Sequence, residues 1–198
     1  MRKMNKRSDY WKEWHKNPRL GISKGAPQFQ PANAQLIVET TQIDRLSRNR
    51  PVSIIEFGPG SGYLCKNLIG KYQSNIANYT LIEDKRILET TRKNLEKCVQ
   101  VEYCTIDNVE ESQPDKNYDL LVSCGCLEET TDEYRDFVYN NFFPVINEVF
   151  IIMMHGSSEQ SETLLQKTLK ENFEKVSDVV KVSHMANWPI YLHHASKF

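Results

Sequence analysis

Short apolar runs alternate with longer amphipathic stretches along most of this chain. The runs have the length and composition of buried strands, and the stretches repeat apolar residues at helical spacing. The predicted strands cover residues 52–57, 79–83, 99–104, 119–124, 149–154, 176–182 and 190–195. The predicted helices cover residues 33–43, 64–72, 87–97, 132–141 and 160–173. Strands that alternate with helices predict βαβ units and a parallel sheet covered on both faces.

The last two predicted strands break this alternation. No helix lies between residues 176–182 and 190–195, and a parallel pair would need a crossover connection. We therefore expect a closing hairpin with one strand antiparallel to the rest. The predicted fold is α/β, a Rossmann-like doubly wound and mainly parallel seven-stranded sheet whose last strand is antiparallel.

Composition and charge narrow the classes of partner. The 198 residues fit one domain, and 25 basic against 26 acidic side chains leave a net charge of −1. That balance argues against a basic nucleic-acid binder. The longest apolar run, 149–154, is far shorter than the ~20 residues of a membrane-spanning helix, and no secretory leader is evident. We expect a small-molecule substrate and no nucleic acid or membrane partner, while a homodimer is left open.

Five cysteines form an odd set without a C-x-x-C pair, which favours reduced thiols in a cytoplasmic protein. Cys124 and Cys126 form a C-x-C pair, but no histidine or further cysteine stands at ligand spacing. We therefore predict buried free thiols here and no metal site.

The most informative segment is 54–62, IIEFGPGSG, in which an apolar strand delivers Glu56 to a turn containing Gly58, Gly60 and Gly62. Glycine permits positive φ and close approach of a ligand, and the helix that follows presents unpaired N–H groups. Dinucleotide binders use G-x-G-x-x-G, whereas Tyr63 stands at the third glycine position here. The carboxylate of Glu56 would repel a pyrophosphate but not a cation. The pattern therefore favours a nucleoside with a positive centre.

Residues 54–62 resemble the first motif of class I S-adenosylmethionine-dependent methyltransferases, and the resemblance extends over most of residues 33–198. It implies S-adenosyl-L-methionine as cofactor, with the methionine portion and ribose against the glycine turn. It also implies that Glu83, 27 residues after Glu56, accepts hydrogen bonds from the ribose hydroxyls. Asp107 and Ile106 would hold the adenine, and the strand tip at Ser123 would contact the cofactor.

The acceptor is less defined. Residues 123–129 contain neither proline nor an aromatic residue, unlike the N/D-P-P-Y/F motif of adenine and glutamine methyltransferases. Residues 118–129 with Tyr134, and residues 79–95, resemble a bacterial family of sugar O-methyltransferases, which tends to carry Asn where this chain has Cys124. This narrower resemblance implies O-methylation of a sugar or polyol.

A hydroxyl acceptor needs a general base, because its proton must leave during transfer. His155 follows the predicted strand 149–154 at the edge that carries the glycine turn, and histidine titrates near neutral pH. Glu129 is the second candidate. His184 and Trp188 could line the pocket from the closing hairpin, whereas His193 and His194 in the last strand are expected to be packing or surface residues.

Residues 1–32 form the remaining segment, basic and aromatic, with Trp11, Trp14 and His15 on one face of a predicted helix. It either packs on the domain or closes as a lid over residues 33–198. Two alternatives to a methyltransferase stay open: a cofactor-binding scaffold or partner subunit without activity, and a nicotinamide-dependent dehydrogenase.

Overall fold

The computed structural model describes residues 43–98, 100–105, 117–124, 126–127, 130, 132–154, 159–185 and 188–198. The segment 1–32 and almost all of the predicted helix 33–43 lie outside this part of the chain. The first described element is a short helix, α4 (Ile43–Leu46). None of the helices that the structure describes has the length and apolar character required to cross a bilayer.

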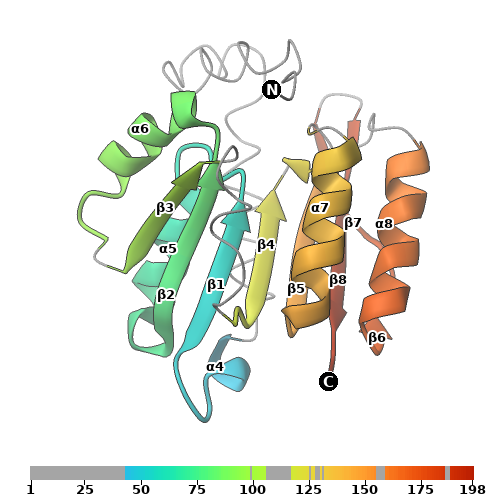
Figure 1. Ribbon diagram of the computed structural model, residues 1–198, viewed down its shortest axis with the longest axis horizontal. Helices are drawn as coiled ribbons and strands as arrows, with labels where there is room; N and C mark the ends of the chain where they lie inside the picture. The colour runs from blue at the N-terminus through green and yellow to red at the C-terminus, as the bar shows by residue number, and fades with distance from the viewer. Residues whose placement is uncertain are drawn as a thin grey trace.

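One mixed sheet organises the chain (Figure 1). Its strand order is β3-β2-β1-β4-β5-β8-β6, and β7 pairs with β8. The strands are β1 (Val52–Phe57), β2 (Ile76–Glu83), β3 (Val101–Thr105), β4 (Leu120–Cys124), β5 (Glu148–Met154), β6 (Lys175–Val176), β7 (Val180–Met185) and β8 (Trp188–Ser196).

The parallel and antiparallel parts of the sheet follow the expectation. The pairs β1–β2, β1–β4, β2–β3 and β4–β5 are parallel, whereas β8 runs antiparallel to β5. Both β6 and β7 pair antiparallel with β8, one after the other along it, so they share the seventh position of the sheet. The prediction of a doubly wound, seven-position sheet with one reversed strand is confirmed.

Helices cover the two faces of the sheet, so the central strands β1 and β4 are buried on both sides. The major helices are α5 (Tyr63–Tyr72), α6 (Lys85–Asn94), α7 (Asp132–Phe142) and α8 (Glu159–Asn172). On one face, Leu64 and Leu68 of α5 pack with Ile54 and Tyr79 in one hydrophobic cluster. On the other face, residues of α7 and α8, which lie side by side in Figure 1, pack with Ile55 and Phe57 in a second cluster.

Several element boundaries differ from the prediction. Strand β2 begins three residues before the predicted residue 79, and α6 spans Lys85–Asn94 instead of 87–97. The predicted strand 176–182 is divided into β6 and β7, since Ser177 and Asp178 are exposed and outside either strand.

A polar cluster, Arg50–Asp119, fixes the amino-terminal ends of β1 and β4. The two guanidinium nitrogens of Arg50 donate to the two carboxylate oxygens of Asp119 over 2.6 and 2.8 Å. The Ser53 backbone N–H and the Asn147 side-chain amide donate to the same carboxylate at 2.9 and 3.1 Å. This cluster lies at the end of the strands opposite the glycine turn.

Candidate functional site

The glycine turn connects β1 to α5 at the carboxyl end of the sheet. Gly58, Gly60 and Gly62 have φ values of 70°, 54° and 78°, in the left-handed region that favours glycine. The Gly58 N–H donates to the Ile82 carbonyl over 2.9 Å, and the Gly62 N–H donates to the Pro59 carbonyl over 2.8 Å. The turn is therefore attached to β2 at one end and closed on itself at the other.

Neighbouring side chains press closely on two of these glycines. A Cβ atom at Gly58 would lie 2.2 Å from the Cβ and 2.5 Å from the Sγ of Cys126. A Cβ atom at Gly62 would lie 2.7 Å from a methyl carbon of Leu95. At both positions a side chain is excluded twice, because the backbone has a positive φ and because a neighbouring side chain occupies the place of a Cβ atom. At Gly58 that neighbour is Cys126.

The carboxylate of Glu83, at the end of β2, holds the middle of the turn. It accepts the Gly60 N–H and the Asp84 N–H, each over 2.8 Å, and the residue is only 5% exposed. Burial raises the pKa of Glu83 to about 7, although the two N–H donors oppose that rise. A carboxylate can accept further hydrogen bonds beside these two, so the ribose role predicted for Glu83 is compatible with this geometry.

The carboxylate of Glu56 lies under the turn, on the α5 face of the sheet. It is 1% exposed, and the Tyr79 hydroxyl donates to it over 2.7 Å. Burial raises the pKa of Glu56 to about 8, with the hydrogen bond from Tyr79 lowering it and the charge of Glu83 raising it.

Two buried carboxylates thus stand beside one loop without a compensating charge in the described part of the chain. No lysine, arginine or histidine described there forms an ion pair with Glu56 or Glu83. Removing a carboxylate from water is unfavourable unless it is paired or takes up a proton. Without a ligand, the raised pKa values of the two carboxyls meet this need by protonation, and a cation at the glycine turn would favour the ionised form. These residues therefore fit a ligand with a positive centre better than one with a pyrophosphate.

Helix α6 braces the same turn from the side. The Thr91 hydroxyl donates to the Gly60 carbonyl over 2.5 Å, and the Asn94 side-chain amide donates to the Ser61 carbonyl over 3.1 Å. Sequence reasoning did not find these contacts, because nothing in the sequence marks a threonine about thirty residues away as a partner of the loop.

Ser123 lies near the end of β4, where its backbone pairs in register with Phe57 of β1 and Ile151 of β5. It is fully buried, and its hydroxyl has no hydrogen-bond partner among the described residues. The strand order brings Ser123 to the same sheet edge as the glycine turn, while its predicted contact with a cofactor stays a prediction.

Four of the predicted site residues lie outside the described residues: Ile106, Asp107, Glu129 and His155. The backbone of His184 and Trp188 is described in β7 and β8, but their side chains are not. Their proposed roles are therefore neither confirmed nor contradicted.

The two histidines of β8 are packing residues, as expected. His193 is buried with its Nδ1 2.6 Å from the Gln166 side-chain nitrogen, and burial lowers its pKa to about 4. The ring of His194 stacks on Phe150 with centroids 4.4 Å apart, and its Nε2 lies 2.7 Å from a carboxylate oxygen of Glu148.

None of the five cysteines, all of which the structure describes, forms a disulfide, in agreement with the reduced thiols that the sequence predicts. Cys124 and Cys126 are half-buried, however, so the expectation that both are buried is wrong; β4 ends at Cys124 and Cys126 lies in the loop beyond it. Within the described ranges, no group of three His, Cys, Asp or Glu side chains is placed to hold a metal ion.

Comparison with known proteins adds to this geometry. No family model matches the sequence, and no curated protein matches it. Many solved structures share the fold. The pyocyanin biosynthetic protein PhzM matches with a TM-score of 0.63 and 14% identity over 95% of this chain and 62% of that chain.

Two further matches carry a methyltransferase assignment in their names. Human N-acetylserotonin methyltransferase, solved with S-adenosylmethionine, has a TM-score of 0.60 and 12% identity over 83% of this chain and 51% of that chain. A Pyrococcus horikoshii protein assigned as an RNA methyltransferase has a TM-score of 0.59 and 14% identity over 83% of this chain and 79% of that chain. The fold is that of class I methyltransferases. This chain is shorter than PhzM and the human enzyme, spanning 62% and 51% of them.

Proposed function

We propose that the protein is an S-adenosylmethionine-dependent methyltransferase. The observation that carries this proposal is the pair of buried carboxylates, Glu56 and Glu83, beside a turn of three left-handed glycines. When bound, S-adenosylmethionine supplies an electrophilic methyl group on a positively charged sulfur. The glycine turn would receive its methionine portion and ribose. Glu83 would accept hydrogen bonds from the ribose hydroxyls, and the carboxylate of Glu56 would offset the positive charge of the sulfur.

The acceptor that we propose is a small molecule, with a hydroxyl of a sugar or related polyol as the methylated group. The sequence between Ser123 and Glu129 lacks the proline and aromatic ring that hold a planar amine in nucleobase methyltransferases. His155 is the proposed general base and Glu129 the alternative, with Ile106 and Asp107 holding the adenine. We also propose a cytoplasmic location, which the five cysteines without a disulfide support.

Thermal denaturation with and without ligand tests the cofactor. A ligand that binds only the folded state raises the melting temperature, so S-adenosylmethionine is expected to stabilise the chain and NADH is not. The result that would remove the proposal is an unchanged melting temperature at millimolar S-adenosylmethionine.

A second function, a scaffold or partner subunit that performs no methyl transfer, is favoured by one observation. The side chain of Cys126 packs directly on Gly58, in the turn that would receive the cofactor. Incubation with labelled S-adenosylmethionine and a set of sugars separates the two: transferred label supports the enzyme, and no transfer, with or without bound label, supports the scaffold.

His155→Gln separates a base from a binding residue. It is expected to lower turnover by about 100-fold or more, the usual contribution of general-base catalysis, while leaving the dissociation constant of S-adenosylmethionine unchanged. A full loss of cofactor binding, or full activity, would assign His155 another role and leave Glu129 as the candidate.

A further inference from the structure

The partner of Glu56 is a second buried side chain with an ionisable group. Tyr79, on β2, is fully buried, and its hydroxyl lies 2.7 Å from one oxygen of the Glu56 carboxylate. A phenol at this distance donates a hydrogen bond to the ionised carboxylate, and a donor to the charged form favours that form.

The surroundings of this pair contain more acids than bases. Glu56 pairs in register with the apolar Val122 of β4 and Leu81 of β2, so neither neighbouring strand supplies a charge at that position. The titratable groups that act on the pair are Glu83 of β2 and Cys65 of α5. Beyond Cys65 lie Cys98, after α6, and Tyr103 of β3, whose ring Arg92 of α6 covers at 5.1 Å. Arg92 is directed to Tyr103, so the Tyr79 hydroxyl is the group that favours the ionised form of Glu56.

We propose that Tyr79 is a positioning residue that controls the charge of Glu56, so that binding of a cationic nucleoside at the glycine turn releases a proton from Glu56. This inference rests on the proposed function for the identity of the ligand, but not for the coupling between Tyr79 and Glu56. The step is an acid dissociation: the O–H bond of the Glu56 carboxyl breaks, the electron pair stays on the carboxylate, and the proton passes to solvent.

The direction of the coupling follows from electrostatics. Burial holds the pKa of Glu56 near 8 in the ligand-free protein, so the carboxyl carries a proton at neutral pH. A positive charge placed at the adjoining turn favours the ionised form and lowers that pKa. Affinity for a cationic ligand therefore rises with pH until Glu56 is already ionised without ligand.

Removal of the Tyr79 hydroxyl leaves the ring in place and takes away the donor. In Tyr79→Phe the pKa of Glu56 rises further, and each unit of that rise lowers the affinity for the cation by about tenfold at neutral pH. Above the new pKa the affinities of variant and wild type converge. A purely structural defect would weaken binding equally at every pH.

Tyr118→Phe is the matched control. Tyr118 is also buried, and its hydroxyl donates over 3.2 Å to a residue of β2, but its acceptor is the Thr80 hydroxyl and not a carboxylate. Each substitution removes one buried phenol oxygen, and the two oxygens lie on opposite faces of β2. Only Tyr79→Phe should change the pH dependence.

The first experiment needs no ligand. The free energy of unfolding in urea is measured from pH 5 to pH 10 for wild type, Tyr79→Phe and Tyr118→Phe. A group with a raised pKa in the folded state makes stability fall as pH rises toward that pKa. The buried Cys65 thiol adds a further fall above pH ~8.5 in all three proteins, so each variant is compared with the wild type at the same pH. We expect the difference in unfolding free energy between Tyr79→Phe and wild type to grow above pH ~8 and that of Tyr118→Phe to stay constant; constant differences for both variants would overturn the assignment.

The second experiment adds S-adenosylmethionine and measures dissociation constants by calorimetry across the same pH range. The dissociation constant of the variant is divided by that of the wild type at each pH. This ratio cancels the titration of the ligand's own amino group, whose pKa is about 8. We expect the Tyr79→Phe ratio to be about tenfold at pH 7 and to approach one above pH ~9.5. A ratio that stays constant with pH would overturn the inference.

The two experiments also separate this inference from the proposed function. If wild type fails to bind S-adenosylmethionine at any pH, the proposed function fails, and the ligand-free measurement still decides the role of Tyr79. If Tyr79→Phe does not fold, 3-fluorotyrosine at position 79 replaces it, since its more acidic phenol donates a stronger hydrogen bond. The variant should then gain stability relative to wild type between pH 7 and pH 8, and a constant difference over that range would overturn the assignment.

Discussion

At the scale of single residues, the buried carboxylate of Glu56 links stability to pH. Its pKa in the folded protein is about 8 against an ordinary value of 4.5, so between these values the folded chain holds a proton that the unfolded chain has lost. This contribution to stability is complete below pH ~4.5 and disappears as pH rises through 8, with a slope approaching about 1.4 kcal/mol per pH unit. Glu83, with a pKa of about 7, adds a fall of the same sign that ends earlier.

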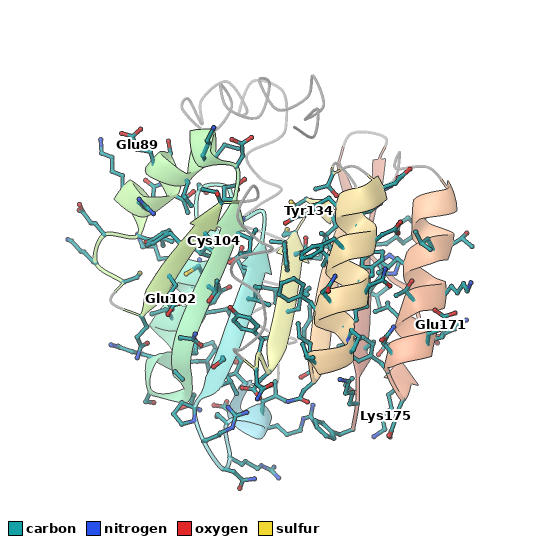
Figure 2. The ribbon with its side chains drawn as sticks, viewed as in Figure 1. Glu89, Glu102, Cys104, Tyr134, Glu171 and Lys175 are labelled. Carbon is teal, nitrogen blue, oxygen red and sulfur yellow. The ribbon has the colours of Figure 1, made fainter. Side chains whose placement is uncertain are left out.

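Glu56→Gln is expected to remove one of these two titrations. The amide stays neutral, so the variant should lose stability less steeply between pH 5 and pH 8 and exceed the wild type at pH 8.5. Urea unfolding at a series of pH values measures both. Glu89→Gln, which changes an exposed residue pointing outward from α6 (Figure 2), is the control that should follow the wild type. Equal slopes in wild type and Glu56→Gln would contradict the account of this carboxylate.

Two glycines of adjacent elements are expected to respond in opposite directions to alanine. Gly58→Ala introduces a Cβ 2.2 Å from the Cβ of Cys126 at φ 70°, and should destabilise the fold by about 1–3 kcal/mol. Gly70→Ala, within α5 and with no atom within 4 Å of the new Cβ, should stabilise it by about 0.5–1 kcal/mol. Thermal and urea unfolding of both variants provide the measurement; a neutral Gly58→Ala would show that the loop carrying Cys126 moves aside easily.

At the scale of elements, the Arg50–Asp119 cluster joins β1 to β4. Because Arg50 is largely exposed, its charge alone stabilises little, and the buried carboxylate of Asp119 matters through the four hydrogen bonds it accepts. Asp119→Ala leaves the half-buried Ser53 N–H without its acceptor and should destabilise the protein by about 1–3 kcal/mol.

The comparison for Asp119→Ala is Glu171→Gln. Glu171 and Lys167 form an exposed pair with a separation of 3.7 Å on α8, and Figure 2 shows Glu171 pointing outward from that helix. Loss of this pair should change the free energy of unfolding by less than about 0.5 kcal/mol. If both substitutions have equal effects, the Arg50–Asp119 cluster does not hold the strands together.

The elements themselves could be predicted from the sequence because strands and helices have different periods. Val52–Phe57 was expected as a strand at its observed bounds, and the three glycines after it predicted the turn. The pairing of Tyr79 with Glu56 could not be predicted, since a contact between side chains on neighbouring strands depends on register. The division of β6 from β7 was missed because Val176–Val182 contains apolar residues on both sides of an exposed pair, Ser177 and Asp178.

At the scale of the whole molecule, the sheet separates the candidate site from the residues that secure its other end. The glycine turn and Glu83 lie at the carboxyl ends of β1 and β2, whereas Asp119 and Arg50 lie at the opposite ends of β4 and β1. Open α/β sheets bind ligands at the carboxyl ends of their strands. Asp119→Ala should therefore lower stability but leave the affinity for S-adenosylmethionine within about twofold of wild type at a temperature where both are folded, since distant sites act independently. A large loss of affinity would show that the two ends are coupled.

The most direct test of the account is calorimetric titration of the full chain with S-adenosylmethionine, with Glu83→Gln and Glu89→Gln as variants. The account predicts one site per chain, with affinity unchanged in Glu89→Gln and lowered by about ten- to a hundredfold in Glu83→Gln, because a charge-assisted hydrogen bond contributes about 1.5–3 kcal/mol. No heat of binding to the folded wild type, or equal affinities in Glu83→Gln and wild type, would contradict it.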